Sequence, residues 1–105
     1  MRSDGRIRLV PVGEVDWIEA ADNYVRLHAG AERHLVRETM AAMETRLDSG
    51  AIRADPRSTI VNLARIRDLQ PTFNGEYAVL LHTGAKLTLS RGSRDALRSR
   101  LGDGW

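Results

Sequence analysis

Hydrophobic and polar residues alternate along most of the chain, which is the pattern of half-buried β-strands. In the stretch 24–28, the apolar Val25 and Leu27 alternate with side chains that have a polar group. The same alternation predicts further strands at 6–10, 33–36, 58–62, 65–69, 77–82 and 86–90. Glycines at Gly30 and Gly84 are typical of the turns between paired strands. The chain is therefore predicted to be mainly β, with many short antiparallel strands.

Two stretches follow a helical period instead. From 39 to 47 the chain is rich in helix formers, and Met43 and Leu47 lie four residues apart on one predicted helix face. Near the C-terminus, Ser93 is predicted to cap a second helix whose apolar stripe includes Leu97. We therefore expect one short inserted helix and one C-terminal helix beside the strands.

The length and composition favour one globular domain. The chain has 105 residues, of which 42% are hydrophobic and 29% are charged. We predict a single domain over residues 1–105 with a core of about 5–101, and no run of residues is apolar and long enough to cross a membrane. The chain contains no cysteine, which excludes disulfides and thiolate sites and is compatible with the reducing cytoplasm. The expected location is therefore cytoplasmic.

Arginine supplies almost all of the positive charge. Lys86 is the only lysine among 16 basic residues, and 14 acidic residues leave a net charge of +2. The planar guanidinium suits phosphate and guanine, but a genome rich in G and C also enriches arginine everywhere, and composition alone favours that explanation. The segment 91–105 contains four arginines and two aspartates, which predicts a local positive region suited to phosphate. The alternative is that these arginines lie on the solvent-exposed face of a helix.

Catalytic and metal-binding patterns are not evident. His28, His34 and His82 lie on separate predicted strands, without the close spacing of a metal-binding pair. The chain has no nucleophile elbow and no phosphate-binding glycine loop. A short acidic run is predicted to be a solvated strand face rather than a cation site: Glu14, Asp16, Glu19 and Asp22. We therefore predict that the chain is not an enzyme, has no catalytic or metal site, and needs no cofactor.

Five short motifs follow one another along the chain: V-D-W-I-E-A leading into N-Y at 15–24, R-E-T-M at 37–40, R-S-T-I-V-N at 57–62, F-N-G-E-Y at 73–77 and L-T-L-S-R at 87–91. In this order they resemble the LytTR family, the DNA-binding domains of bacterial response regulators. The likeness covers roughly residues 5–101, and R-S-T-I-V-N is its most specific part.

The resemblance implies an elongated fold of about ten short antiparallel strands in several small sheets, with one inserted helix and a C-terminal helix. It also implies sequence-specific binding of double-stranded DNA by the output domain of a transcription regulator in a two-component system. Loops and strand ends would reach successive grooves. Two copies are expected on repeated half-sites, as a possible homodimer on DNA. The family joins such a domain to an N-terminal receiver or sensory domain, which these residues do not contain.

The resemblance also carries site residues over to this chain. They are Asn23 and Tyr24 in a first DNA-facing loop, Arg57 and Ser58 in the middle, Arg91 after the last strand, and Arg37 and Arg94 as weaker candidates. Arginine suits guanine or phosphate, asparagine suits adenine, and a serine hydroxyl suits a backbone oxygen. Each also has a structural alternative: Asn23 as a turn former, Tyr24 packed on the sheet, and Arg37 or Arg94 simply facing solvent.

One segment departs from the family pattern R-[IV]-H-R-S. Here Pro56 replaces the histidine, one extra residue precedes Arg57, and Asp55 adds a negative charge. Because proline restricts its own φ and the residue before it, the backbone entering Arg57 is expected to differ from that of relatives. This change motivates the alternative of a β-rich protein-interaction domain that has lost DNA binding. The alternative gains if Asn23, Arg57 and Arg91 lie on different faces.

Overall fold

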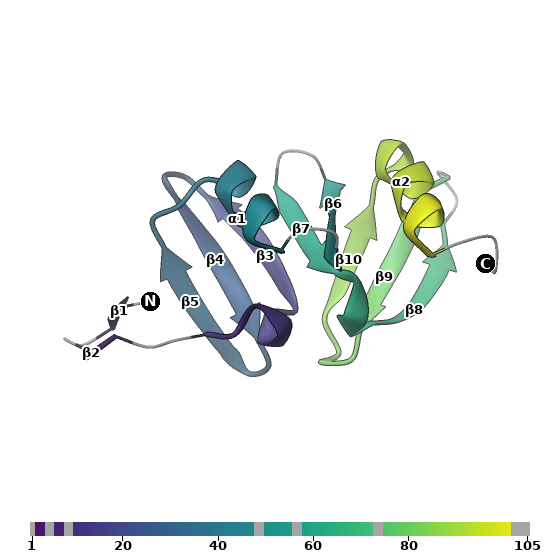
Figure 1. The fold of residues 1–105 in the computed structure, drawn as a ribbon. Coiled ribbons are helices and arrows are strands. Elements are labelled where there is room, and N and C mark those ends of the chain that lie inside the picture. The colour runs from purple at the N-terminus through teal and green to yellow at the C-terminus, as the bar shows by residue number, and fades with distance from the viewer. Residues whose placement is uncertain are drawn as a thin grey trace.

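The computed structural model describes residues 2–3, 6–7, 10–47, 50–55, 58–72 and 75–101. The chain forms a mainly β, elongated fold with extents of 46 × 24 × 23 Å (Figure 1). A small ladder of β1 (Arg2–Ser3) and β2 (Arg6–Ile7) precedes the body. The fold class predicted from the sequence is confirmed.

A five-stranded antiparallel sheet forms one half of the body, in the order β5-β4-β3-β7-β6. Its strands are β3 (Trp17–Ala21), β4 (Tyr24–Ala29), β5 (Glu32–Val36), β6 (Ala51–Asp55) and β7 (Thr59–Asn62). A three-stranded antiparallel sheet forms the other half, in the order β10-β9-β8. Its strands are β8 (Ile66–Pro71), β9 (Tyr77–Leu81) and β10 (Lys86–Leu89).

The two sheets lie side by side along the long axis of the molecule, with β6 next to β10 (Figure 1). The backbone N–H of Ser90 donates to the carbonyl of Ala54 at 2.9 Å. Ala54 is available because the β6–β7 register shifts between Arg53 and Asp55, leaving one extra residue on β6. This β-bulge therefore frees a carbonyl that binds the chain just before the C-terminal helix. It also lies where the sequence has one residue more than the family pattern.

Strand β6 was not predicted from the sequence. Ala51, Ile52 and Ala54 are all buried, because β6 contributes to the cores on both faces of its sheet. A strand buried on both faces lacks the alternation that identifies a half-buried strand. The other strands in the body follow the predicted or family-implied segments to within a few residues.

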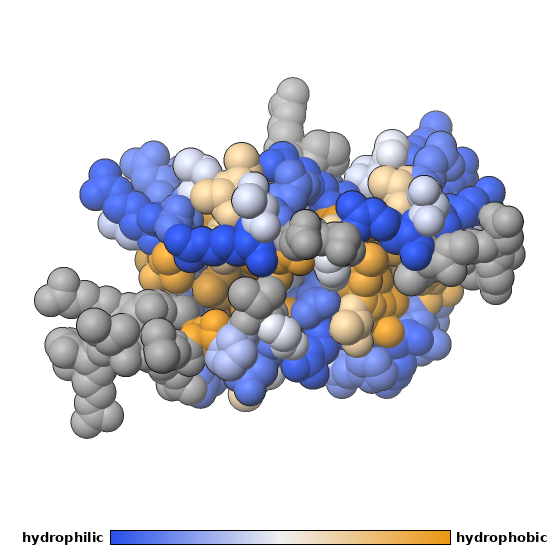
Figure 2. Space-filling model, viewed as in Figure 1, coloured by the Kyte–Doolittle hydropathy of each residue, from blue (hydrophilic) through white to orange (hydrophobic). Residues whose placement is uncertain are grey.

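Two hydrophobic cores hold the body together, and β6 and β7 supply residues to both. The first lies between the five-stranded sheet and α1 (Met40–Leu47): Val15, Ile18, Val25, Leu27, Met43, Leu47, Ala51 and Ile60. The second joins the two sheets to α2 (Arg91–Leu101): Ile52, Ala54, Val61, Val79, Leu81, Leu89 and Leu97. Figure 2 shows apolar residues through the middle of the molecule and hydrophilic ones along its rims.

The first helix begins as its sequence predicts. The Thr39 hydroxyl accepts from the N–H of Ala42 at 3.0 Å, and Met43 and Leu47 are buried. The predicted start of the second helix was wrong. Helix α2 begins at Arg91. The residue that caps it is Ser90, not Ser93, because the Ser90 hydroxyl accepts from the N–H of Ser93 at 3.3 Å.

Candidate nucleic-acid interface

Antiparallel pairing places several turns and strand ends along one long edge of the molecule, the upper edge in Figure 1. The β3–β4 turn lies there because Ala21 pairs with Tyr24. The start of β7 lies beside it, since Ala20 donates its N–H to the carbonyl of Ser58 at 2.8 Å. The Ser90–Ala54 hydrogen bond brings the start of α2 to the end of β6. We call the edge formed by Asn23, Tyr24, Ser58 and Arg91 the contact edge.

The first part of the contact edge is a two-residue turn. Asp22 has a φ of 57°, which aspartate tolerates in tight turns, and Asn23 follows it. Both are exposed, and 41% of Tyr24 is accessible. Arg37 is exposed at the end of β5, where Val36 pairs with Val25 next to this turn. Asn23 thus forms a turn and is exposed to a ligand at the same time.

The middle of the contact edge is the connection from β6 to β7. Ser58 is exposed, its N–H donates to the Asp55 carbonyl at 3.3 Å, and its hydroxyl lies 3.1 Å from that of Thr59. Pro56 and the candidate Arg57 lie outside the described residues. Their predicted conformation and role therefore remain predictions.

The third part is the first turn of α2. Arg91 is exposed, and its side chain runs beside Gly75 in the β8–β9 loop. Arg94 is half-buried and donates through Nη1 to the Gly75 carbonyl at 3.3 Å. Its Nε is buried and has no hydrogen-bond partner in the described part of the chain. Arg94 is therefore held against the loop, and the alternative of a simply solvent-facing side chain is wrong.

An ion-pair network lies on the face of the five-stranded sheet opposite α1. The Glu19 carboxylate accepts from Arg26 Nη1 at 2.9 Å and contacts His28 Nε2 at 2.8 Å, and His28 stacks on Trp17 with ring centroids 3.9 Å apart. Burial opposes ionisation of Glu19, but the hydrogen bonds and positive charges of Arg26 and His28 outweigh it, so its pKa is lowered. His28 is therefore packed between Trp17 and the Glu19 carboxylate.

The prediction of a solvated acidic face was wrong for two of its four residues. Asp16 is only 2% exposed, and its carboxylate accepts from the N–H of Gly30 at 2.6 Å and lies 3.5 Å from Arg65 Nε. Glu19 is half-buried in its network, whereas Glu14 and Asp22 are exposed. Asp16 therefore ties the β4–β5 turn to the 3₁₀ helix Leu63–Arg65, a structural role.

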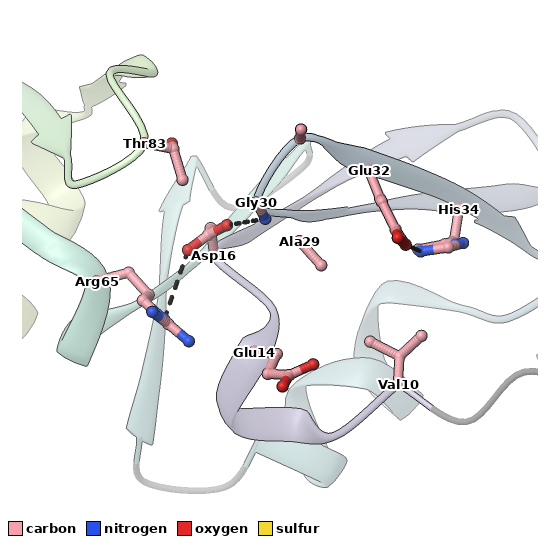
Figure 3. A pocket seen from close by; sticks show the side chains of 10 residues that line it. Val10, Glu14, Asp16, Ala29, Gly30, Glu32, His34, Arg65 and Thr83 are labelled. Carbon is pink, nitrogen blue, oxygen red and sulfur yellow. Dashed lines mark hydrogen bonds and ion pairs between the residues drawn. The ribbon is translucent and has the colours of Figure 1, made fainter.

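A cavity of about 490 Å³ lies around Asp16 (Figure 3), beyond the end of β3 that is opposite the β3–β4 turn of the contact edge. The lining includes a histidine, His34, and the carboxylates of Glu14, Asp16 and Glu32, an arrangement that the sequence did not predict. Two of the carboxylates are paired, because His34 Nε2 lies 3.1 Å from Glu32 and Asp16 binds Gly30 and Arg65. The described residues include no group of three or more side chains placed to hold a metal ion.

Two residues of the family-like motifs have roles that sequence reasoning missed, Asn62 near Asp16 and Gly75 at the contact edge. Asn62, the last residue of R-S-T-I-V-N, is buried; its Nδ2 donates to the Val15 carbonyl at 2.8 Å and its Oδ1 accepts from the N–H of Ala64 at 3.1 Å. This part of the motif is therefore structural. Gly75, in F-N-G-E-Y, has a φ of 77° and contacts both Arg91 and Arg94. In the sequence, the pair Asn74–Gly75 is typical of a turn and does not by itself indicate a contact with Arg91.

Comparison with known proteins assigns this arrangement to a family. The model of the family described as the LytTr DNA-binding domain matches residues 5–102. A solved structure, the LytTr DNA-binding domain of a Bacillus cereus protein described as a methyl-accepting/DNA response regulator, superposes with a TM-score of 0.84. The two are 25% identical, and the match covers 98% of this chain and 94% of that one.

Curated relatives share the same region. The chain is 30% identical over 86 residues to the sensory transduction protein LytT of Bacillus subtilis, covering 81% of this chain and 35% of that protein. It is 24% identical over 102 residues to the LytT protein of Enterococcus faecalis, covering 97% of this chain and 42% of that protein. The chain thus spans between a third and a half of the length of these relatives. No helix in the described ranges is long and apolar enough to cross a membrane.

Proposed function

This chain belongs to the LytTr DNA-binding domain family, and on that premise we propose that it binds double-stranded DNA sequence-specifically as the output domain of a bacterial transcription regulator in a two-component system. The residues 1–105 act as one cytoplasmic domain that recognises DNA without changing it chemically. The contact edge reaches successive grooves through turns and strand ends, in place of a recognition helix.

The observation that carries this proposal is the shared position of the candidate residues. Asn23, Ser58 and Arg91 come from separate segments of the chain, and strand pairing brings them to one long edge. An elongated edge of this kind is suited to a duplex, whose grooves follow one another along an axis. The test that separates this function from an interaction domain that has lost DNA binding concerns Asn23, Arg57 and Arg91. Arg57 lies outside the described residues, so the shared edge of Asn23 and Arg91 supports the proposal and the interaction domain stays the alternative.

Each candidate has a chemical role that its side chain can perform. Arg57 and Arg91 bind guanine or a phosphate through paired N–H donors, and Asn23 binds adenine. Ser58 and Tyr24 donate hydroxyl hydrogen bonds to backbone oxygens, and Arg37 adds positive charge beside Tyr24. Arg94 acts mainly by supporting the loop that Arg91 contacts.

The partners follow from the same proposal. Two copies bind repeated half-sites, with possible contact between copies on DNA, and an N-terminal receiver or sensory domain supplies the signal. The relatives' greater length is the support for a further domain.

The test is selection of duplexes from a random pool, followed by fluorescence anisotropy and a salt titration on the selected motif. We expect Arg91→Ala and Arg57→Ala each to weaken binding by about 1–3 kcal/mol and to relax one position of the motif. The matched control is Arg67→Ala, an exposed β8 arginine paired with Asp68 outside the contact edge, which should leave affinity unchanged. If no motif is enriched and the domain binds no duplex, the interaction-domain alternative takes over.

A further inference from the structure

The backbone of Gly75 and the first turn of α2 form a close contact at the contact edge. A Cβ built on Gly75 would lie 3.2 Å from Arg91 Nε, 3.7 Å from its Cδ and 3.8 Å from its Cγ. The Arg91 side chain therefore passes over the bare Cα of Gly75 along most of its length. On the other side, Arg94 Nη1 holds the Gly75 carbonyl at 3.3 Å.

Glycine has two physical advantages at this position. Its φ of 77° lies in the left-handed region, where a Cβ is disfavoured. The missing side chain also leaves the space that the Arg91 stem fills, and a contact of 3.2 Å is tighter than an ordinary carbon–nitrogen contact. A methyl group there would displace Nε, and because the guanidinium lies beyond Nε, its position would shift with it.

We propose that Gly75 is a positioning residue for DNA recognition, and that it sets the direction in which Arg91 presents its guanidinium to the duplex. The inference rests on the proposed function, since it acts through a DNA-contacting Arg91. Recognition by a bidentate arginine depends on orientation as well as charge, so a displaced side chain retains its charge but loses base discrimination.

A double-mutant cycle tests this inference. Gly75→Ala, Arg91→Ala and the double variant are compared for affinity to the selected motif and to a scrambled duplex. The matched control is Gly84→Ala, because Gly84 also has a left-handed φ, of 94°, but has nothing within 4 Å of a built Cβ and lies in the β9–β10 turn. Gly75→Asn is a second variant, since asparagine tolerates a positive φ while still placing a side chain beside Arg91.

We expect Gly75→Ala and Gly75→Asn to weaken binding to the motif about three- to tenfold, part of the loss of a full arginine contact, and to reduce discrimination against the scrambled duplex. Neither should weaken binding further in the Arg91→Ala background, and Gly84→Ala should bind as the parent does. If Arg91→Ala weakens binding but the Gly75 variants match Gly84→Ala, or their effect persists without Arg91, the positioning role is wrong while the proposed function stands. If Arg91→Ala binds the motif like the parent, Arg91 does not contact DNA, and both the proposed contact of Arg91 and the positioning role of Gly75 are wrong.

Discussion

At the scale of single residues, burial separates side chains that look alike in the sequence. Asp16 is enclosed and accepts from Gly30 at 2.6 Å, whereas Asp68 forms an ion pair with Arg67 at the surface. We expect Asp16→Ala to lower the free energy of unfolding by about 1.5–3 kcal/mol, because it removes a charge-assisted acceptor from the Gly30 N–H and the ion pair with Arg65. Asp68→Ala should cost at most about 0.5 kcal/mol.

Urea denaturation of the two variants measures this difference. The Asp16 variant should keep its affinity for the selected duplex when folded, because Asp16 lies just before β3, at the end of the strand opposite the β3–β4 turn of the contact edge. Equal stabilities of Asp16→Ala and the parent would mean that the carboxylate contributes nothing net to the fold.

Glu19 gives the domain a defined acid sensitivity. Its folded-state pKa lies below the ordinary 4.5, because the hydrogen bonds and charges of Arg26 and His28 outweigh its burial. Glu19 therefore binds a proton more readily in the unfolded state than in the folded state. The contribution of ionised Glu19 to the stability of the fold is present above pH 4.5 and is lost as the pH falls through the folded-state pKa. We expect the free energy of unfolding of Glu19→Gln to decrease less than that of the parent as the pH is lowered. Urea denaturation at a series of pH values measures this difference. Parallel curves for the variant and the parent would contradict the prediction.

At the scale of elements, the start of α2 separates two serines. The Ser90 hydroxyl accepts from the N–H of Ser93, whereas the buried Ser93 hydroxyl bonds to the hydroxyl of Ser90. We expect Ser90→Ala to cost about 1 kcal/mol, the usual value of a helix N-cap, and Ser93→Ala to cost clearly less. Thermal unfolding of both variants measures the order. The reverse order would show that Ser93 caps the helix, as its place before the apolar stripe predicts.

The strands and helices show why local patterns predict some elements and miss others. Helix α1 was predictable because Thr39, Met43 and Leu47 carry a cap and an apolar face within nine residues. Strand β6 was not, because tertiary packing on both faces removes the alternation from its sequence. The bulge at Ala54 was visible only as one extra residue relative to a family pattern, and its hydrogen bond is to Ser90, which lies 36 residues later in the chain, just after β10.

At the scale of the whole molecule, the contact edge is a product of pairing that no single segment encodes. Motif order predicted Asn23, Ser58 and Arg91 as candidates, but their common edge follows from the β3–β4, β3–β7 and β6–β10 contacts. Gly75 was not predictable as a site residue, since its effect requires Arg91 to lie across it. The family resemblance supplied the candidate side chains, and long-range packing supplied their arrangement.

The arrangement also predicts how much DNA one domain needs. Eight strands of the described body stand side by side along its long axis, and at about 4.8 Å per strand they span roughly 35–40 Å. One turn of B-DNA is about 34 Å, so the whole long edge of the body covers about one turn, or roughly 10 base pairs, and the contact edge lies within that length. We therefore expect affinity for the selected motif to stay constant as flanks are removed down to about 12 base pairs and to fall steeply below about 10. Anisotropy on a nested series of duplexes measures this limit. Undiminished affinity on a duplex of about 7 base pairs would mean that only one part of the contact edge touches DNA.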